Sequence, residues 1–126
     1  MKKYWLLPLV LAAIIALSVL SINYLGDTTR RIDHILPQLE DSIAAENWSE
    51  AQLQYTAAKK IWDQANKILP TFINHDDMRD VQVAFVDLET AIKQQDKIEA
   101  TRELAALHFY IDHVLENEHL NLQNLL

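Results

Sequence analysis

WSEAQLQYTAAKKIWDQANKIL, residues 48–69, decides the fold of this chain. Its apolar positions recur at alternating steps of three and four residues, and large rings alternate there with small side chains. The positions are Trp48, Ala51, Tyr55, Ala58, Trp62, Ala65 and Leu69. This spacing places them on one face of an α-helix, and each ring can fill the gap that a small residue leaves opposite. The stretch predicts a helix with one face buried against other helices.

Three further stretches have the same period. They are residues 28–46 with Ile32, Leu36, Leu39 and Ile43; the stretch after Asn74 with Met78, Val81, Phe85, Leu88 and Ile92; and the stretch from Asp96 with Ala100, Leu104, Leu107, Ile111 and Val114. Glycine occurs once and proline three times, too few turn-forming residues for a β-sandwich. We therefore predict an all-α fold. Its core is expected to contain Trp48, Ala51, Tyr55, Ala58, Trp62, Phe85, Leu88, Leu104, Leu107 and Ile111.

An internal similarity indicates how these helices pair. Residues 46–51 (ENWSEA) and 95–100 (QDKIEA) each place Asn or Asp at a helix entry and Glu-Ala one turn later. The amide or carboxylate can cap the helix, and the alanine permits close approach of a neighbouring helix. We expect two αα-hairpins that form a four-helix up-and-down bundle.

The N-terminal segment predicts a transmembrane helix. Residues 4–25 contain no charged side chain, and about 20 helical residues cross the ~30 Å hydrocarbon core of a bilayer. The segment would contact lipid, with residues 1–26 as the anchor and residues 27–126 as a soluble helical domain. The alternative is a cleaved signal peptide, processed near Ser18 or Ser21. Retention as a single-pass signal-anchor is favoured, because the apolar run is long and the residues after these serines suit cleavage poorly.

Basic residues favour one orientation of the anchor. Lys2 and Lys3 precede the apolar run, whereas Arg30 and Arg31 follow it beside Asp27 and Asp33. Positively charged flanks stay in the cytoplasm. We expect the N-terminus inside and the helical domain outside.

Composition excludes several classes of function. The net charge of −7 and the lack of a dense basic cluster disfavour nucleic-acid binding. The chain has no cysteine, so it has no disulfide, thiolate metal site or cysteine nucleophile. Neither a glycine-rich phosphate loop nor a Gly-flanked serine is present. We expect a protein that is not an enzyme, with no catalytic residues, metal or cofactor.

Histidines provide the candidate site residues. His75, Asp76 and Asp77 lie between the second and third predicted helices and could respond to protons or bind a ligand. The alternative, which we favour, is that Asn74 or Asp76 caps the third helix while His75 packs over Trp62 or Phe72. Glu116 and His119 have a spacing found in bundle metal sites, but no second copy exists, and we expect the pair to be exposed to solvent.

The C-terminal stretch contains leucines that need a partner. Leu120, Leu122, Leu125 and Leu126 follow a polar turn of the fourth predicted helix. They would either fold back into a groove between helices, which we favour, or contact another chain. The candidate contacts with a ligand or partner are therefore His75, Asp76, Asp77, Leu120, Leu122 and Leu125.

The whole chain resembles an uncharacterised bacterial family, domain of unknown function family 4363. The likeness rests on the lysine-led N-terminal anchor, NWSEA at residues 47–51, Trp62, FINHD at residues 72–76 and LNLQNL at residues 120–125. The resemblance implies a small membrane-anchored helical protein. It implies no activity, cofactor or catalytic residue.

These features lead to one function and one alternative. We expect a non-enzymatic interaction or scaffold protein of the bacterial cell envelope, anchored in the cytoplasmic membrane and bound to another envelope protein or to itself. The alternative is an extracytoplasmic sensor that binds a small ligand, a cation or protons near His75.

Overall fold

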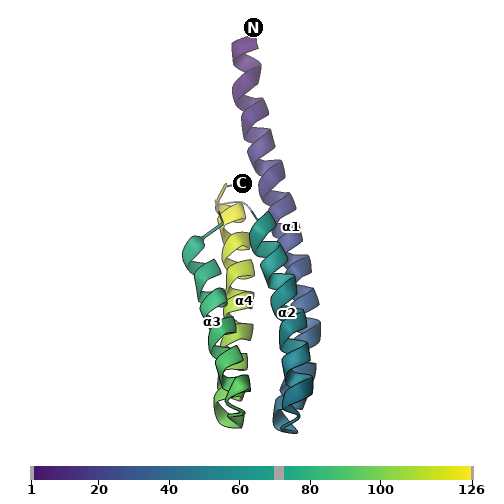
Figure 1. Cartoon of the computed structure of the whole chain (residues 1–126). Coiled ribbons are helices and arrows are strands. Elements are labelled where there is room, and N and C mark those ends of the chain that lie inside the picture. Colours follow the sequence, from purple (N-terminus) through teal and green to yellow (C-terminus); the bar gives the residue numbers. More distant parts are fainter. Residues whose placement is uncertain (1, 70–72, 126) are drawn as a thin grey trace.

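Four helices make up the described structure, a computed structural model (Figure 1). It describes residues 2–69 and 73–125, with side chains over residues 4–69 and 73–124. The helices are α1 (Lys2–Ala44), α2 (Trp48–Ile68), α3 (His75–Lys93) and α4 (Lys97–Leu125). The described residues contain no strand. The predicted all-α class is confirmed.

The helices form an up-and-down bundle of two αα-hairpins, as expected. α1 packs along α2 and α3 along α4, and the two hairpins join mainly through contacts between α1 and α4. Both hairpin turns lie at the end of the bundle farthest from the N-terminus (Figure 1). The end of α2, the start of α3 and the C-terminal end of α4 lie at the opposite end, where α1 leaves the bundle.

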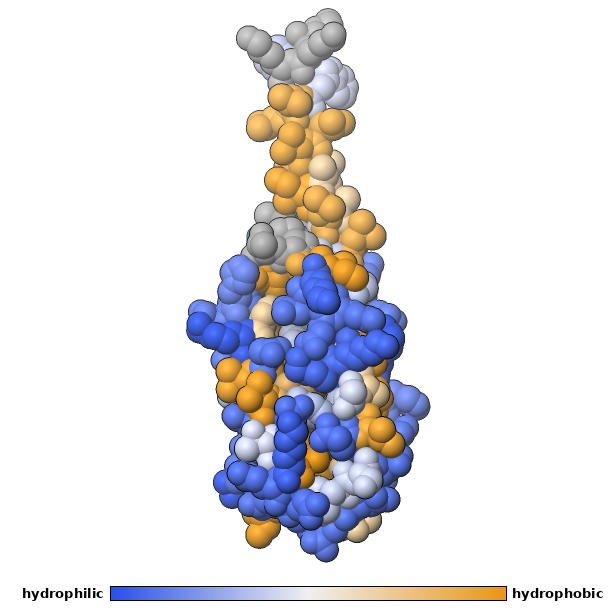
Figure 2. All heavy atoms as spheres, in the orientation of Figure 1, coloured by the Kyte–Doolittle hydropathy of each residue, from blue (hydrophilic) through white to orange (hydrophobic). Residues whose placement is uncertain are grey.

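The apolar N-terminal segment and the first bundle helix are one continuous helix. Over residues 4–20, which we call the apolar arm, the large hydrophobic side chains are mostly exposed, and the arm projects beyond the bundle (Figures 1 and 2). α1 is the one helix of the described structure that is long and apolar enough to cross a membrane. Burial begins at Ile22 and Leu25, so the last residues of the expected membrane segment pack inside the bundle.

Aromatic residues fill the middle of the bundle core. The ring of Phe85 lies 6.0 Å from that of Tyr55, edge to face, and 6.4 Å from that of Trp62. The Tyr55 hydroxyl donates a hydrogen bond to the Phe85 carbonyl at 2.9 Å. Ala51, Ala58 and Ala65 alternate with Tyr55 and Trp62 along α2 and are fully buried. All the expected core residues are buried except Trp48, which begins α2 at the end of the bundle and is half-buried.

The two hairpin turns have the same geometry, which explains the internal similarity. Glu46 and Gln95 both adopt left-handed backbone conformations, with φ of 56° and 55°. The following residue in each turn, Asn47 or Asp96, donates its backbone N–H to the carbonyl five residues earlier, at 2.9 and 3.1 Å. Its side chain accepts from the N–H three residues later, at 3.4 and 3.0 Å. Each turn thus ends one helix and caps the next.

Candidate functional site

Three potential metal ligands meet where α1 and α4 pack together. Asp33 follows the buried Ile32 on α1, and His108 follows the buried Leu107 on α4. Asp112 lies one turn after His108, so both project from the same face of α4. Because these residues flank the buried stripes of their helices, the packing of α1 on α4 brings their polar groups to the edge of the same seam.

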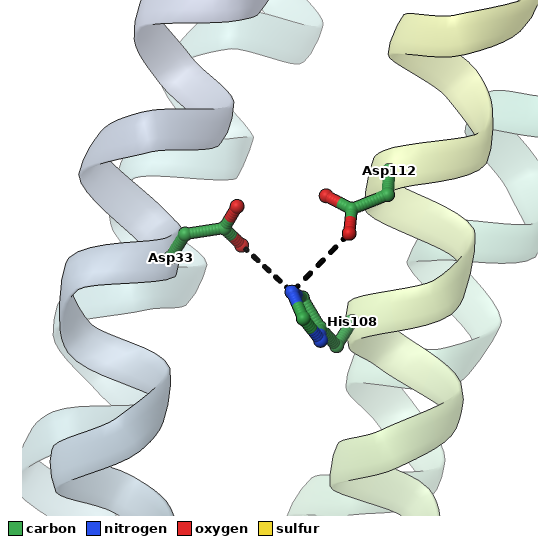
Figure 3. A group of neighbouring side chains, drawn as sticks. All are labelled: Asp33, His108 and Asp112. Atoms are coloured by element: carbon green, nitrogen blue, oxygen red, sulfur yellow. Dashed lines mark ion pairs between the residues drawn. The ribbon is translucent and has the colours of Figure 1, made fainter.

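The imidazole of His108 lies between the two carboxylates (Figure 3). Its Nε2 atom is 3.2 Å from Oδ2 of Asp112 and 3.6 Å from Oδ1 of Asp33. One ligand atom from each of the three residues lies within 4.8 Å of the others. We call these three residues the Asp–His–Asp cluster.

The electrostatics of the cluster disfavour the negative charge on Asp33. Burial raises the pKa of the Asp33 carboxyl above its usual value, and the nearby Asp112 raises it further, while His108 acts in the opposite direction. Oδ1 of Asp33 is shielded from solvent and has no hydrogen-bond partner among the described residues. The arrangement can bind a proton or a cation between α1 and α4.

A shallow groove continues from the cluster along the same seam. It has a volume of about 350 Å³, and Leu36, Pro37, Leu104 and Ala105 give it a mainly apolar lining. Asp33 and His108 form one part of its wall, with Glu40 and Thr101 elsewhere in the lining. Because Asp33 and His108 belong to both, the cluster and the groove form one continuous surface feature.

Pro37 has no backbone N–H, so the carbonyl of Asp33 lacks its usual donor within α1.

A second polar feature lies where the apolar arm meets the bundle. The carboxylate of Glu118 is buried and accepts a hydrogen bond from the Asn74 backbone N–H at 3.4 Å. Burial raises the pKa of Glu118, the Asn74 hydrogen bond lowers it, and the charge of Asp77 raises it. Glu118 lines a hollow of about 180 Å³ together with Ser18, Ser21, Ile22, Ile73, Asn121 and Leu122.

The family model described as "Domain of unknown function (DUF4363)" matches residues 19–125. The chain belongs to this family. The match covers the bundle, the Asp–His–Asp cluster and the groove, whereas most of the apolar arm precedes it. Comparisons with curated proteins and with solved structures found no match. The description of DUF4363 names no activity.

In this DUF4363 chain, His75 lies at the exposed start of α3. His75 and Asp76 are exposed in the first turn of α3, whereas Trp62 is fully buried; Phe72 lies outside the described residues. Of the two capping residues considered, Asn74 caps α3, because its Oδ1 accepts the backbone N–H groups of Asp76 at 2.9 Å and Asp77 at 3.4 Å. The exposure of His75 disagrees with its expected packing over Trp62, while the expected contact with Phe72 lies outside the described residues.

Asp77 is separated from His75 and contacts α4 instead. Its buried carboxylate accepts a hydrogen bond from Nδ2 of Asn117 at 2.6 Å and lies 3.9 Å from Nε2 of His113. The predicted group of His75, Asp76 and Asp77 is therefore not a single site. Asp77 has the contacts of a structural residue that joins α3 to α4.

The C-terminal leucines differ in their environments. These residues continue α4 up to Leu125, so the chain does not fold back as expected; Leu122 is half-buried and lines the hollow at Glu118, whereas Leu120 is 51% exposed. The side chain of Leu125 lies outside the described residues. Glu116 and His119 are exposed, as expected.

Sequence reasoning missed the Asp–His–Asp cluster. Asp33 and His108 are far apart in sequence, and no local motif links them. The spacing of four between His108 and Asp112 was a signal for half of the cluster. Glu118 was also missed, although it continues the buried stripe of Ile111 and Val114 at helical spacing.

Proposed function

We propose that this protein is a membrane-anchored, non-enzymatic interaction protein of the bacterial cell envelope. The observation that carries the proposal is the continuity of α1, which runs from the exposed apolar arm into the bundle core. The arm of residues 4–20 is about 26 Å long at about 1.5 Å per residue, close to the ~30 Å of a hydrocarbon core. Apolar side chains exposed in such numbers indicate a surface that contacts lipid or protein.

A continuous helix would hold the bundle at a fixed height above the bilayer. Asp33 lies 13 residues beyond Leu20, which corresponds to about 20 Å along α1. Partners that reach the bundle would therefore themselves be membrane-bound or lie close to the membrane. Another envelope protein or a second copy of this chain meets this requirement.

The charges near the arm support the proposed orientation. Arg30 and Arg31 begin ten residues beyond the arm, on the part of α1 that belongs to the bundle. Lys2 and Lys3 precede the arm without an acidic residue beside them in sequence. This difference favours a cytoplasmic N-terminus and an extracytoplasmic bundle.

A charge placed in the arm tests the anchoring step. We expect Leu11→Arg to move full-length protein from the membrane fraction to the aqueous fraction, because an arginine at the centre of a membrane helix costs about 2.5–3.5 kcal/mol of insertion free energy. The matched control is Leu53→Arg, at an exposed position of α2, which is expected to leave the distribution unchanged. Wild-type protein in the aqueous fraction without detergent would contradict the proposal.

Crosslinking in intact cells tests the interaction itself. A photo-crosslinking residue at the exposed position 105, at the α1–α4 seam, should yield a specific crosslinked product, either with another envelope protein or between two copies. The same residue at position 60, exposed on α2, is the comparison. Protein recovered only as an uncrosslinked monomer from every position would overturn the proposed interaction role.

The alternative sensor function draws more support from the Asp–His–Asp cluster than from His75. His75 and Asp76 are exposed at a helix start, whereas the cluster joins helices from both hairpins. A proton or cation bound there would act on the packing of α1 against α4. Sensing would therefore operate at the hairpin interface.

A further inference from the structure

We propose that Asp33, His108 and Asp112 form a binding site for one divalent transition-metal ion, with Zn²⁺ as the representative ion, that bridges α1 and α4. This inference goes beyond the interaction role, and the two can fail separately.

The donor set has the chemistry of such a site. An imidazole nitrogen suits zinc and its neighbours in the first transition row, and carboxylate oxygens complete mixed sites of this kind. Two carboxylates carry two negative charges, which a divalent ion neutralises and a single protonated imidazole does not. Mg²⁺ and Ca²⁺ prefer oxygen ligands only and lose the contribution of His108.

The spacing of the donor atoms is close to that of a bound ion. Tetrahedral zinc with ligand bonds of about 2.0–2.1 Å requires donor atoms about 3.3 Å apart. Nε2 of His108 is 3.2 Å from the Asp112 oxygen and 3.6 Å from the Asp33 oxygen. The remaining pair lies within 4.8 Å, a gap that rotation of partly exposed side chains can close.

The surroundings leave room for an ion and for a water ligand. The side chains of His108 and Asp112 are 54% and 51% exposed, and that of Asp33 is 34% exposed. Three protein ligands with one open position is a frequent arrangement around zinc. An ion can therefore enter from solvent without opening the bundle.

The state of Asp33 is an independent indication of a missing partner. Its Oδ1 atom is shielded from solvent and makes no hydrogen bond within the described residues, because His108 lies too far away at 3.6 Å. Such an oxygen loses its hydration without compensation. A coordinated cation would satisfy it and would offset the repulsion between the carboxylates of Asp33 and Asp112.

Other histidines of the described structure lack this combination. His113 faces Oδ1 of Asp77 at 3.9 Å, Asn117 donates to the other oxygen of that carboxylate, and no third ligand completes a set there among the described residues. His119 and Glu116 are exposed near the end of α4. They provide matched controls on the same helix.

Binding at the cluster would connect the two hairpins. Asp33 belongs to the hairpin of α1 and α2, and His108 and Asp112 belong to that of α3 and α4. An ion that binds only the folded bundle stabilises it by an amount that grows with the logarithm of the free-ion concentration above the Kd. Metal binding would thus hold α1 and α4 together more firmly and reduce the movement of the residues that line the adjacent groove.

Calorimetric titration of tag-free, metal-stripped full-length protein in detergent micelles with Zn²⁺ tests the proposal. We expect one equivalent to bind, with at least about tenfold weaker affinity in His108→Ala and in Asp112→Asn. His119→Ala should bind as the wild type does. Co²⁺ should give the visible absorption of a low-coordination site in the wild type and in His119→Ala, but not in His108→Ala.

Thermal unfolding provides a second readout that a merely structural role would not change. Zn²⁺ should raise the unfolding temperature of the wild type and of His119→Ala, and should leave that of His108→Ala unchanged. Absence of Zn²⁺ binding to the wild type, unchanged affinity in both cluster variants, or loss of affinity in His119→Ala would each overturn the proposal. Because both cluster side chains are half exposed, we expect the variants to fold, and circular dichroism verifies it.

Discussion

At the scale of single residues, Glu118 has the clearest energetic consequence. Burial raises the pKa of its carboxyl above the usual value, so the folded state favours the protonated form. A group whose pKa is higher in the folded state contributes stability that is complete below its unfolded pKa and is lost as pH rises through its folded pKa. Ionised Glu118 therefore lowers the free energy of unfolding near neutral pH.

We expect Glu118→Gln to raise the unfolding temperature at pH 7 and to reduce the gain in stability that the wild type shows on acidification towards pH 5. The amide oxygen can still accept the Asn74 N–H, so the change isolates the charge. Glu116→Gln is the control, because Glu116 is exposed two residues away. Identical effects of the two substitutions would show that burial of Glu118 is not the cause. The measurement is thermal unfolding at several pH values.

Residue periodicity predicted which side chains face inward, but not what they meet there. The steps of three and four through Tyr55, Ala58 and Trp62 placed these residues correctly in the core. Which side chains of α4 face a given side chain of α1 depends on how far α4 is shifted along α1. Asp33 and His108 were therefore missed, since a single sequence contains no information on that register.

At the scale of elements, the two hairpin turns carry backbone strain that the sequence does not reveal. Glu46 and Gln95 hold positive φ, a region that glycine adopts at the end of many helices without steric penalty. The similarity of residues 46–51 and 95–100 predicted the caps and the pairing into hairpins. It did not predict the left-handed residues, because neither turn contains the glycine that usually marks them.

We expect Glu46→Gly and Gln95→Gly each to increase the free energy of unfolding by about 1 kcal/mol, because glycine removes the cost of the left-handed conformation. Lys60→Gly, at an exposed position inside α2, should decrease it by about 0.8–1 kcal/mol. Urea unfolding of the three variants measures these differences. The expected result is an increase in the free energy of unfolding at the two turn positions and a decrease at position 60. If both turn glycines decreased it, Glu46 and Gln95 would not be strained.

At the scale of the whole molecule, burial in the bundle begins before the predicted border near Gly26. An uncharged run from residue 4 to residue 25 suggested a border near Gly26. The structure shows Ile22 and Leu25 buried against other helices, on the same helix that carries the exposed arm. Hydropathy does not distinguish a side chain that faces lipid from one that faces α4, so only packing locates this border.

The point at which α1 begins to stabilise the bundle can be located with two shortened chains, residues 21–126 and 27–126. We expect the free energy of unfolding of the longer fragment to be several kcal/mol higher, because loss of a buried Leu or Ile side chain typically costs about 2–5 kcal/mol. Leu25 is fully buried and Ile22 nearly so. A fragment of residues 17–126 is the control, since it adds the exposed Leu17, Val19 and Leu20 and should gain little. Equal stability of the two shorter fragments in urea unfolding would mean that the bundle begins after Gly26, and that the arm and the bundle are energetically separate.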